Sequence, residues 1–82
     1  MFKLKAPNGL NNLCGKNVAR LRREQKPPLT QRELAKKIQL KGYDVDHHFV
    51  RRIENGERFV TDIELCILAE VFDVRLEELI RR

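Results

Sequence analysis

Two short sequence patterns constrain the fold of this chain more than any other feature, because each marks the start of a helix. Thr30-Gln31-Arg32-Glu33 and Thr61-Asp62-Ile63-Glu64 both have the form of a capping box, in which a threonine and a glutamate three positions later pair with each other's free backbone amides. Hydrophobic residues that can close a staple flank both boxes: Leu29 and Leu34, then Val60 and Leu65. No segment alternates convincingly as a strand does, so the sequence predicts an all-α fold.

Apolar residues recur at helical spacing in five segments and predict five helices. The inward-facing positions are, in chain order, Cys14, Val18 and Leu21; Leu34, Ala35 and Ile38; Val50 and Ile53; Leu65, Leu68, Ala69 and Phe72; and Leu76, Leu79 and Ile80. Two prolines at 27 and 28 end the first helix, which spans about residues 12–25, and Gly42 is expected to end the second. We expect residues 1–11 to form an irregular arm and residues 12–82 to form one domain.

The third predicted helix carries the pattern that points to a function. Asp46 is its expected cap, and Val45 and Val50 are its expected staple. At about 100° per residue, Val50 and Ile53 form a narrow apolar stripe that must face the core. The opposite arc contains hydrogen-bond donors and no acidic residue: His47, His48, Arg51, Arg52 and Asn55. Such a face suits the phosphate-lined groove of a nucleic acid.

Charge is unevenly distributed along the chain. The whole sequence has 17 basic and 12 acidic residues, a net charge of +5. Residues 1–41 hold eleven of the basic and two of the acidic residues, whereas residues 42–82 are acidic on balance. This uneven charge distribution could orient one face towards a polyanion, or the charged residues could simply form an ordinary solvated surface. Charge alone does not decide between these two interpretations.

Glu54 is the one acidic residue in the body of the third helix, and it lies at the edge of the donor-rich arc. An exposed charge is one interpretation. We expect instead an ion pair with Arg22 of the first helix, because a partly buried pair of this kind would set how the two helices cross.

Three segments taken in order resemble the helix-turn-helix of phage repressor and Cro-type (XRE-like) regulators. They are Thr30-Gln31-Arg32-Glu33-Leu34-Ala35, Ile53-Glu54-Asn55-Gly56-Glu57-Arg58, and Leu65-x-x-Leu68-Ala69. The resemblance covers about residues 12–81. It implies a compact five-helix bundle of the lambda-repressor-like type, whose second and third helices bind double-stranded DNA. Members of this family usually bind palindromic operators as homodimers, and many are repressors or antitoxins.

The resemblance also assigns roles to individual residues. It places His47, His48 and Arg52 at base-reading positions, and the helical wheel adds Arg51 to this set. The resemblance implies phosphate contacts by Gln31, Asn55 and Arg58. Beyond the resemblance, we also expect phosphate contacts from Lys41 and Tyr43, and the alternative for Tyr43 is that it braces the connection between the second and third helices. The pair formed by Arg22 and Glu54 matches a structural ion pair of the family.

The chain departs from the family pattern between its second and third helices and at the start of its last helix. The family often joins its second and third helices by a turn of about four residues, whereas residues 39–45 are additional here. We interpret the addition as a longer second helix together with a longer turn, which could move the recognition helix relative to the groove. Arg75 stands where a Ser or Thr cap is expected, which weakens the start of the last helix.

Other surfaces allow other partners. A second apolar stripe, formed by Ile63, Ile67 and Val71, is more often explained by core packing than by a partner subunit. The acidic half could dock a toxin or another regulator protein, as in an antitoxin; its acidic residues include Asp62, Glu64, Glu70, Asp73, Glu77 and Glu78. We do not expect an enzyme, because the sequence has no Gly-rich phosphate loop, no nucleophile–base signature and no paired-carboxylate cleft.

No cofactor or metal is expected. Cys14 and Cys66 are interpreted as two buried, reduced thiols. The sequence has no Cys-x-x-Cys pair, and the adjacent His47 and His48 diverge by about 100° on a helix, which makes a poor chelate. The chain has no apolar run of membrane-spanning length and no signal-peptide pattern, so we expect a cytoplasmic protein that does not enter a membrane. The resemblance to phage repressor and Cro-type regulators implies a bacterial or phage origin.

Overall fold

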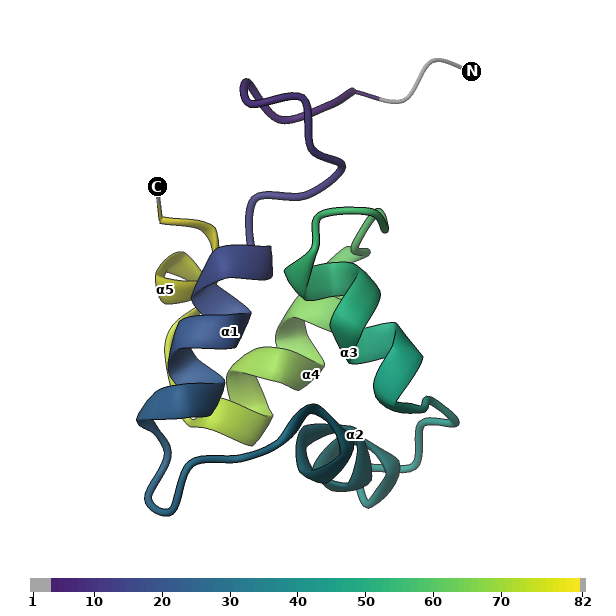
Figure 1. The fold of residues 1–82 in the computed structure, drawn as a ribbon, viewed down its shortest axis with the longest axis vertical. Helices are drawn as coiled ribbons and strands as arrows, with labels where there is room; N and C mark the ends of the chain where they lie inside the picture. The colour runs from purple at the N-terminus through teal and green to yellow at the C-terminus, as the bar shows by residue number, and fades with distance from the viewer. Residues whose placement is uncertain (1–3, 82) are drawn as a thin grey trace.

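The computed structural model describes residues 4–81, in which five helices and no strands occur (Figure 1). The all-α prediction is therefore confirmed. The helices are α1 (Gly15–Glu24), α2 (Gln31–Gln39), α3 (His47–Glu54), α4 (Asp62–Phe72) and α5 (Leu76–Ile80). In Figure 1, α5 and α1 lie on the left, α4 runs through the middle, α3 lies on the right, and α2 lies below them. No described helix combines the length and the apolar character needed to cross a membrane.

Three of the helices start where the capping patterns predict. The Thr30 hydroxyl accepts a hydrogen bond from the Glu33 amide (3.0 Å), and the Glu33 carboxylate accepts one from the Thr30 amide (2.8 Å). Thr61 and Glu64 form the same reciprocal pair at 3.2 and 2.9 Å. Asp46 caps α3 by accepting from two backbone amides. Each cap satisfies amides that the helix itself leaves free.

The ends of α1 and α2 differ from the sequence prediction. The first helix begins at Gly15 rather than near residue 12, because the Asn12 side chain accepts from the Gly15 amide (2.8 Å) and turns the chain there. The predicted lengthening of the second helix is wrong: α2 ends at Gln39, and the chain tightens into a turn in which the Gly42 amide donates to the Gln39 carbonyl (2.9 Å). The additional residues therefore lie in the connection to α3. Gly42 completes that turn with a φ of +94°, which favours glycine.

The core is formed by one buried set of residues from all five helices and the N-cap of α1. It comprises Cys14, Val18, Leu21, Leu34, Ala35, Ile38, Val50, Ile53, Ile67, Leu68, Ala69, Phe72 and Leu79. A bundle this small gains its stability mainly from burying these faces against each other. In this arrangement one face of α3 is buried in the core and the opposite face remains exposed to solvent.

Three details of the predicted core are corrected by the structure. Leu76 and Ile80 are each 44% exposed, because a helix as short as α5 can bury only one face and Leu79 occupies it. Cys66 is exposed, so only Cys14 is a buried thiol, and burial raises its pKa to about 11. The second apolar stripe divides: Ile67 joins the core, whereas Ile63 is 64% exposed.

Candidate nucleic-acid interface

The third helix lies with one face in the core and the other on the surface. Val50 and Ile53 are 1% and 0% exposed, so the apolar stripe is fully buried. The opposite face presents the donor-rich set as exposed or half-buried side chains: His47, His48, Arg51, Arg52 and Asn55. Helices α2 and α3 pack against each other near one edge of the bundle, and residues 40–46 connect them (Figure 1).

The two histidines lie side by side at the start of this face. Their ring centroids are 4.1 Å apart, with a 35° angle between the ring planes. The Arg51 guanidinium approaches Nδ1 of His48 at 3.4 Å. Partial burial lowers the pKa of His47, and the positive charge of Arg32 on α2 lowers it further. A larger fraction of His47 is therefore neutral at pH 7 than of an ordinary histidine. In the neutral ring, one nitrogen can donate a hydrogen bond and the other can accept one.

Arg52 lies one turn further along α3 and is exposed. Among the residues that the structure describes, its guanidinium has no hydrogen-bond or ion-pair partner. A bidentate donor that is not used within the protein is available to an external acceptor.

The C-terminal end of α3 is held by an ion pair that joins it to α1. Glu54 receives a bidentate interaction from Arg22 of α1, with Nε at 2.7 Å and Nη2 at 2.9 Å. Arg22 also donates to the Leu29 carbonyl at 2.9 Å, and these side chains of Arg22 and Glu54 are only 12% and 6% exposed. The hydrogen bonds to Glu54 raise the pKa of Arg22. The ion pair expected from the sequence is thus present, and it is largely shielded from solvent.

Gln31, expected to contact phosphate, is part of this buried network. Its side-chain amide donates to Oε1 of Glu54 at 3.0 Å and so links the first turn of α2 to the end of α3. Sequence reasoning did not reveal this contact, because residues 23 positions apart give no periodic pattern that would pair them.

The loop after α3 holds two more of the expected phosphate contacts, Asn55 and Arg58. Asn55 is exposed and donates to Oε2 of Glu57 at 3.1 Å. Arg58 forms an ion pair with Glu64, and its guanidinium lies 4.7 Å from the centroid of the Phe49 ring. A carboxylate and an aromatic face therefore orient Arg58 beside α3. Neither partner was evident from the sequence, in which Glu64 has only its capping role.

Lys41 and Tyr43 lie in the long connection between α2 and α3. The Lys41 ammonium is 3.7 Å from a carboxylate oxygen of Glu70 on α4. Tyr43 is 42% exposed and lines a small pocket of about 60 Å³ together with Val45 and Phe49. Both residues therefore belong to this connection and not to the donor-rich face of α3.

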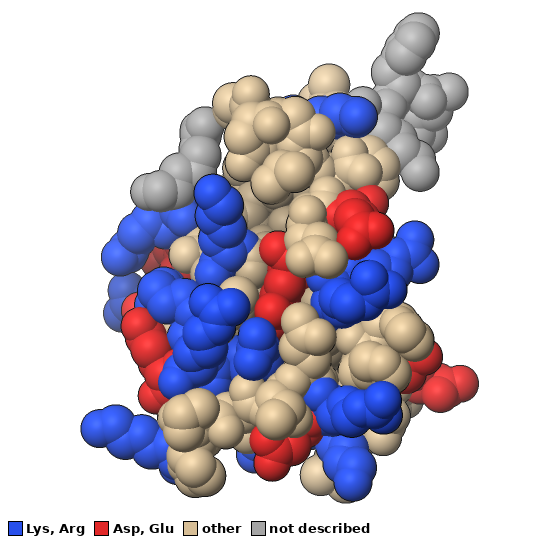
Figure 2. Space-filling view, viewed as in Figure 1, with Lys and Arg blue, Asp and Glu red and all other residues tan. Residues whose placement is uncertain are grey.

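Basic side chains dominate much of the surface around these helices. Figure 2 shows Lys and Arg over α1 and around α2 and α3, with acidic groups between them. Within residues 4–81, no three His, Cys, Asp or Glu side chains come close enough to hold a metal ion.

A helix-turn-helix family model matches residues 20–79, which include α2, α3 and the connection between them. The chain belongs to the helix-turn-helix family. This assignment confirms the resemblance to Cro-type regulators, the lambda-repressor-like fold and a role in DNA binding and transcription regulation. Neither a curated protein nor a solved structure matches the chain.

Proposed function

We propose that this helix-turn-helix protein is a sequence-specific repressor that inserts α3 into the major groove of double-stranded DNA. The observation that carries the proposal is the composition of the exposed face of α3. Every residue on it can donate a hydrogen bond, and Val50 and Ile53 anchor the opposite face in the core. The major groove admits an α-helix, and its floor presents acceptors on guanine and adenine.

Base reading is assigned to four side chains of this face: His47, His48, Arg51 and Arg52. Arg52 is exposed, and its guanidinium has no hydrogen-bond partner among the described residues, so it can donate two hydrogen bonds to O6 and N7 of guanine. The neutral His47 offers one donor and one acceptor, which distinguishes bases better than a donor alone.

Phosphate contacts are assigned to the flanks of α3. Asn55 and Arg58 follow the helix directly, and their placement in one short loop suits a single phosphate segment. Gln31 is proposed to contact the backbone while its amide remains hydrogen-bonded to Glu54. Lys41 and Tyr43 complete the set from the long connection, at the other end of α3.

We further propose that two copies bind a palindromic operator. A two-fold dimer would place two α3 helices about one turn of DNA apart, which matches a palindrome. The exposed side chain of Ile63 on α4 is available to such a contact. Repression then follows from occupancy of the operator.

Selection of bound duplexes from a random pool tests the proposal directly. We expect one motif to be enriched, and a Kd for that motif at least a thousandfold below the Kd for scrambled duplexes. The double variant Arg51→Ala/Arg52→Ala should lose the enrichment. Arg20→Ala/Arg23→Ala on α1 removes the same charge away from α3 and should keep it.

Two results would overturn the proposal. One is equal binding of all duplexes, which would show charge attraction without base reading. The other is binding to no duplex at moderate salt, which would favour a protein-docking role for the acidic half.

A further inference from the structure

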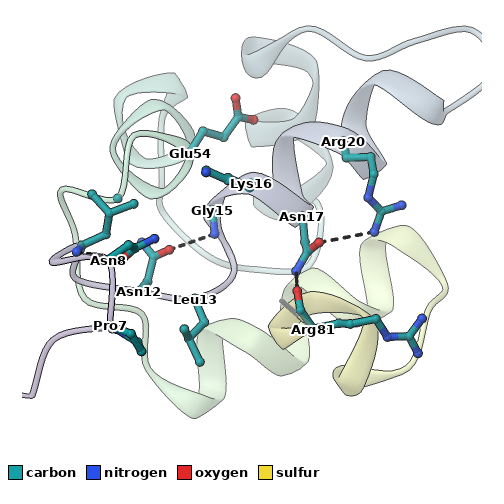
Figure 3. Close-up of a pocket in the computed structure, with 12 residues that line it drawn as sticks. Pro7, Asn8, Asn12, Leu13, Gly15, Lys16, Asn17, Arg20, Glu54 and Arg81 are labelled. Carbon is teal, nitrogen blue, oxygen red and sulfur yellow. Dashed lines mark hydrogen bonds between the residues drawn. The ribbon is translucent and has the colours of Figure 1, made fainter.

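The segment before α1 is bonded to the far end of the recognition helix. The side-chain amide of Asn12 donates to the carbonyls of Ile53 (3.2 Å) and Arg58 (2.8 Å). Its carbonyl oxygen simultaneously accepts from the Gly15 amide at 2.8 Å, an interaction visible in Figure 3. One side chain therefore connects the start of α1, the end of α3 and the loop that follows α3.

Asn11 extends the same connection. Its backbone amide donates to the Gly56 carbonyl at 2.9 Å, and its side-chain amide donates to the Glu57 carbonyl at 2.9 Å. A helix leaves its last carbonyls without partners inside the helix. Here Asn11 and Asn12 satisfy four carbonyls at the end of α3 and in the loop, those of residues 53, 56, 57 and 58.

The backbone is closely packed where the segment before α1 meets the end of α3 and the loop that follows it. A Cβ on Gly15 would lie 2.2 Å from the Ile53 carbonyl oxygen, so α1 and α3 meet at backbone distance. Gly56 has a φ of +75°, and a Cβ there would lie 2.9 Å from the Leu10 side chain. The loop is therefore confined between the segment before α1 and the end of α3.

We infer that Asn11 and Asn12 are positioning residues for DNA binding: they hold the loop of residues 55–58 against α1 and so set where Asn55 and Arg58 meet the duplex. The inference rests on the proposed function, because Asn55 and Arg58 are its phosphate contacts. Neither asparagine needs to touch DNA. Their amides are already used by backbone carbonyls, and their effect passes through the loop.

Asn17 offers a matched control within the same chain. Its side-chain amide donates to the carbonyls of Leu79 (2.8 Å) and Arg81 (2.7 Å), and its oxygen accepts from Arg20 at 3.5 Å. Figure 3 shows Asn12 and Asn17 on opposite sides of the same pocket, which has a volume of about 450 Å³. Both asparagines thus donate twice and accept once, but only Asn12 is bonded to the α3 loop.

The test compares Asn12→Ala with Asn17→Ala by two measurements. The first is amide hydrogen exchange of residues 55–58 in the free protein, which we expect to accelerate at least tenfold more in Asn12→Ala. The second is the slope of log affinity against log salt concentration for the selected duplex. We expect Asn12→Ala to flatten this slope by about one to two units, as when one or two phosphate contacts are lost, and Asn17→Ala to leave it unchanged.

Asn11→Ala is the milder variant if Asn12→Ala does not fold. It removes one exposed side-chain hydrogen bond and keeps the backbone bond to Gly56. We expect a smaller change in the same direction in both measurements. Equal exchange of the loop in the Asn12 and Asn17 variants, or an unchanged salt slope despite faster exchange, overturns the inference. Failure of the wild-type protein to bind any duplex overturns the proposed function instead, and the exchange measurement still decides whether the asparagines hold the loop.

Discussion

The two ends of α3 are held in very different ways. At the C-terminal end, Glu54 is paired with Arg22 and Gln31, and Asn12 donates to the Ile53 carbonyl. At the N-terminal end, the helix is held by its own cap, Asp46, and by a hydrogen bond from Gln39 of α2 to the carbonyl just before that cap (2.6 Å). Val45 and Phe49 also pack against the core at this end. In terms of side-chain hydrogen bonds and ion pairs, α3 is thus firmly held at its C-terminal end and lightly held at its N-terminal end.

This difference explains how the fold tolerates a long connection between α2 and α3. Residues 40–46 separate the two helices, which is more than the family's usual turn. If the turn alone placed α3, the added residues would displace it. Glu54 is bonded to α1 and α2, so α3 is attached to the bundle independently of this connection, whose residues 40–44 are exposed.

Removal of the Glu54 carboxylate should give the largest effect of any change discussed here. Glu54→Ala leaves Arg22 with one carbonyl partner and Gln31 with none at this site, in surroundings that exclude most water. Breaking one side of such a pair costs about 3–5 kcal/mol. We expect the free energy of unfolding in urea to fall by this amount.

The exposed pair Arg20–Glu24 on α1 provides the control for this prediction. Its side chains are 49% and 58% exposed. Glu24→Ala should therefore cost only about 0.2–0.5 kcal/mol. Similar losses in the two variants would mean that the C-terminal end of α3 is no better held than the surface.

The second largest effect should separate base reading from phosphate binding. Arg52→Ala removes an unpaired guanidinium from the exposed face of α3 and should reduce discrimination between the selected and scrambled duplexes by about 1–3 kcal/mol. Arg58→Ala removes a guanidinium from the held end and should weaken binding to all duplexes alike, with a salt slope flatter by about one unit. Fluorescence anisotropy titrations at several salt concentrations distinguish the two patterns, and identical behaviour of the variants would refute this division.

Most of the fold could be predicted from the sequence, because it depends on local rules. The caps at Thr30, Asp46 and Thr61 and the buried stripes of α1–α4 follow from residue type and helical spacing. Errors arose where tertiary context decides the outcome. The short α5 buries Leu79 alone, and α2 ends at Gln39 because the chain turns back towards α3.

The sequence predicted the exposed donor-rich face of α3 and one of the contacts that support it, the Arg22–Glu54 pair, but not the other supporting contacts. A helical wheel was sufficient to predict the donor-rich face of α3. The contacts of Gln31 with Glu54, of Arg58 with Glu64 and of Asn12 with the α3 loop join residues from separate segments. No periodicity links such pairs, so only the folded structure reveals them.

The lightly held end of α3 should be sensitive to acid. A hydrogen bond from the Phe49 amide is the main cause that lowers the pKa of Asp46. The unfolded chain therefore takes up a proton at a higher pH than the folded chain, and the capping stabilisation is lost as pH falls through the folded pKa. Asp46→Asn keeps a capping oxygen without this titration. We expect its urea midpoint to fall less steeply with acidification below pH 4 than that of the wild type.

Comparison with the held end sharpens this prediction. Asp46→Asn should leave the hydrogen exchange of residues 53–58 unchanged, since Asn12 and Glu54 secure that end independently. Acid sensitivity equal to that of the wild type would show that protonation of Asp46 does not contribute to the loss of stability in acid.

The smallest effect concerns His47, at the same lightly held end. Burial, and then the charge of Arg32, lower its pKa, so the ring gains its positive charge only at a pH below the ordinary histidine value of about 6.5. The cation has two donors and no acceptor, which favours phosphate over a particular base edge. We expect binding to tighten a few-fold and to become less selective between pH 6.5 and 5.5, and His47→Gln to lose part of this response. An affinity that is constant from pH 5.5 to 7.5 would show that His47 does not contact the duplex, which would leave Arg51 and Arg52 as the main readers of sequence.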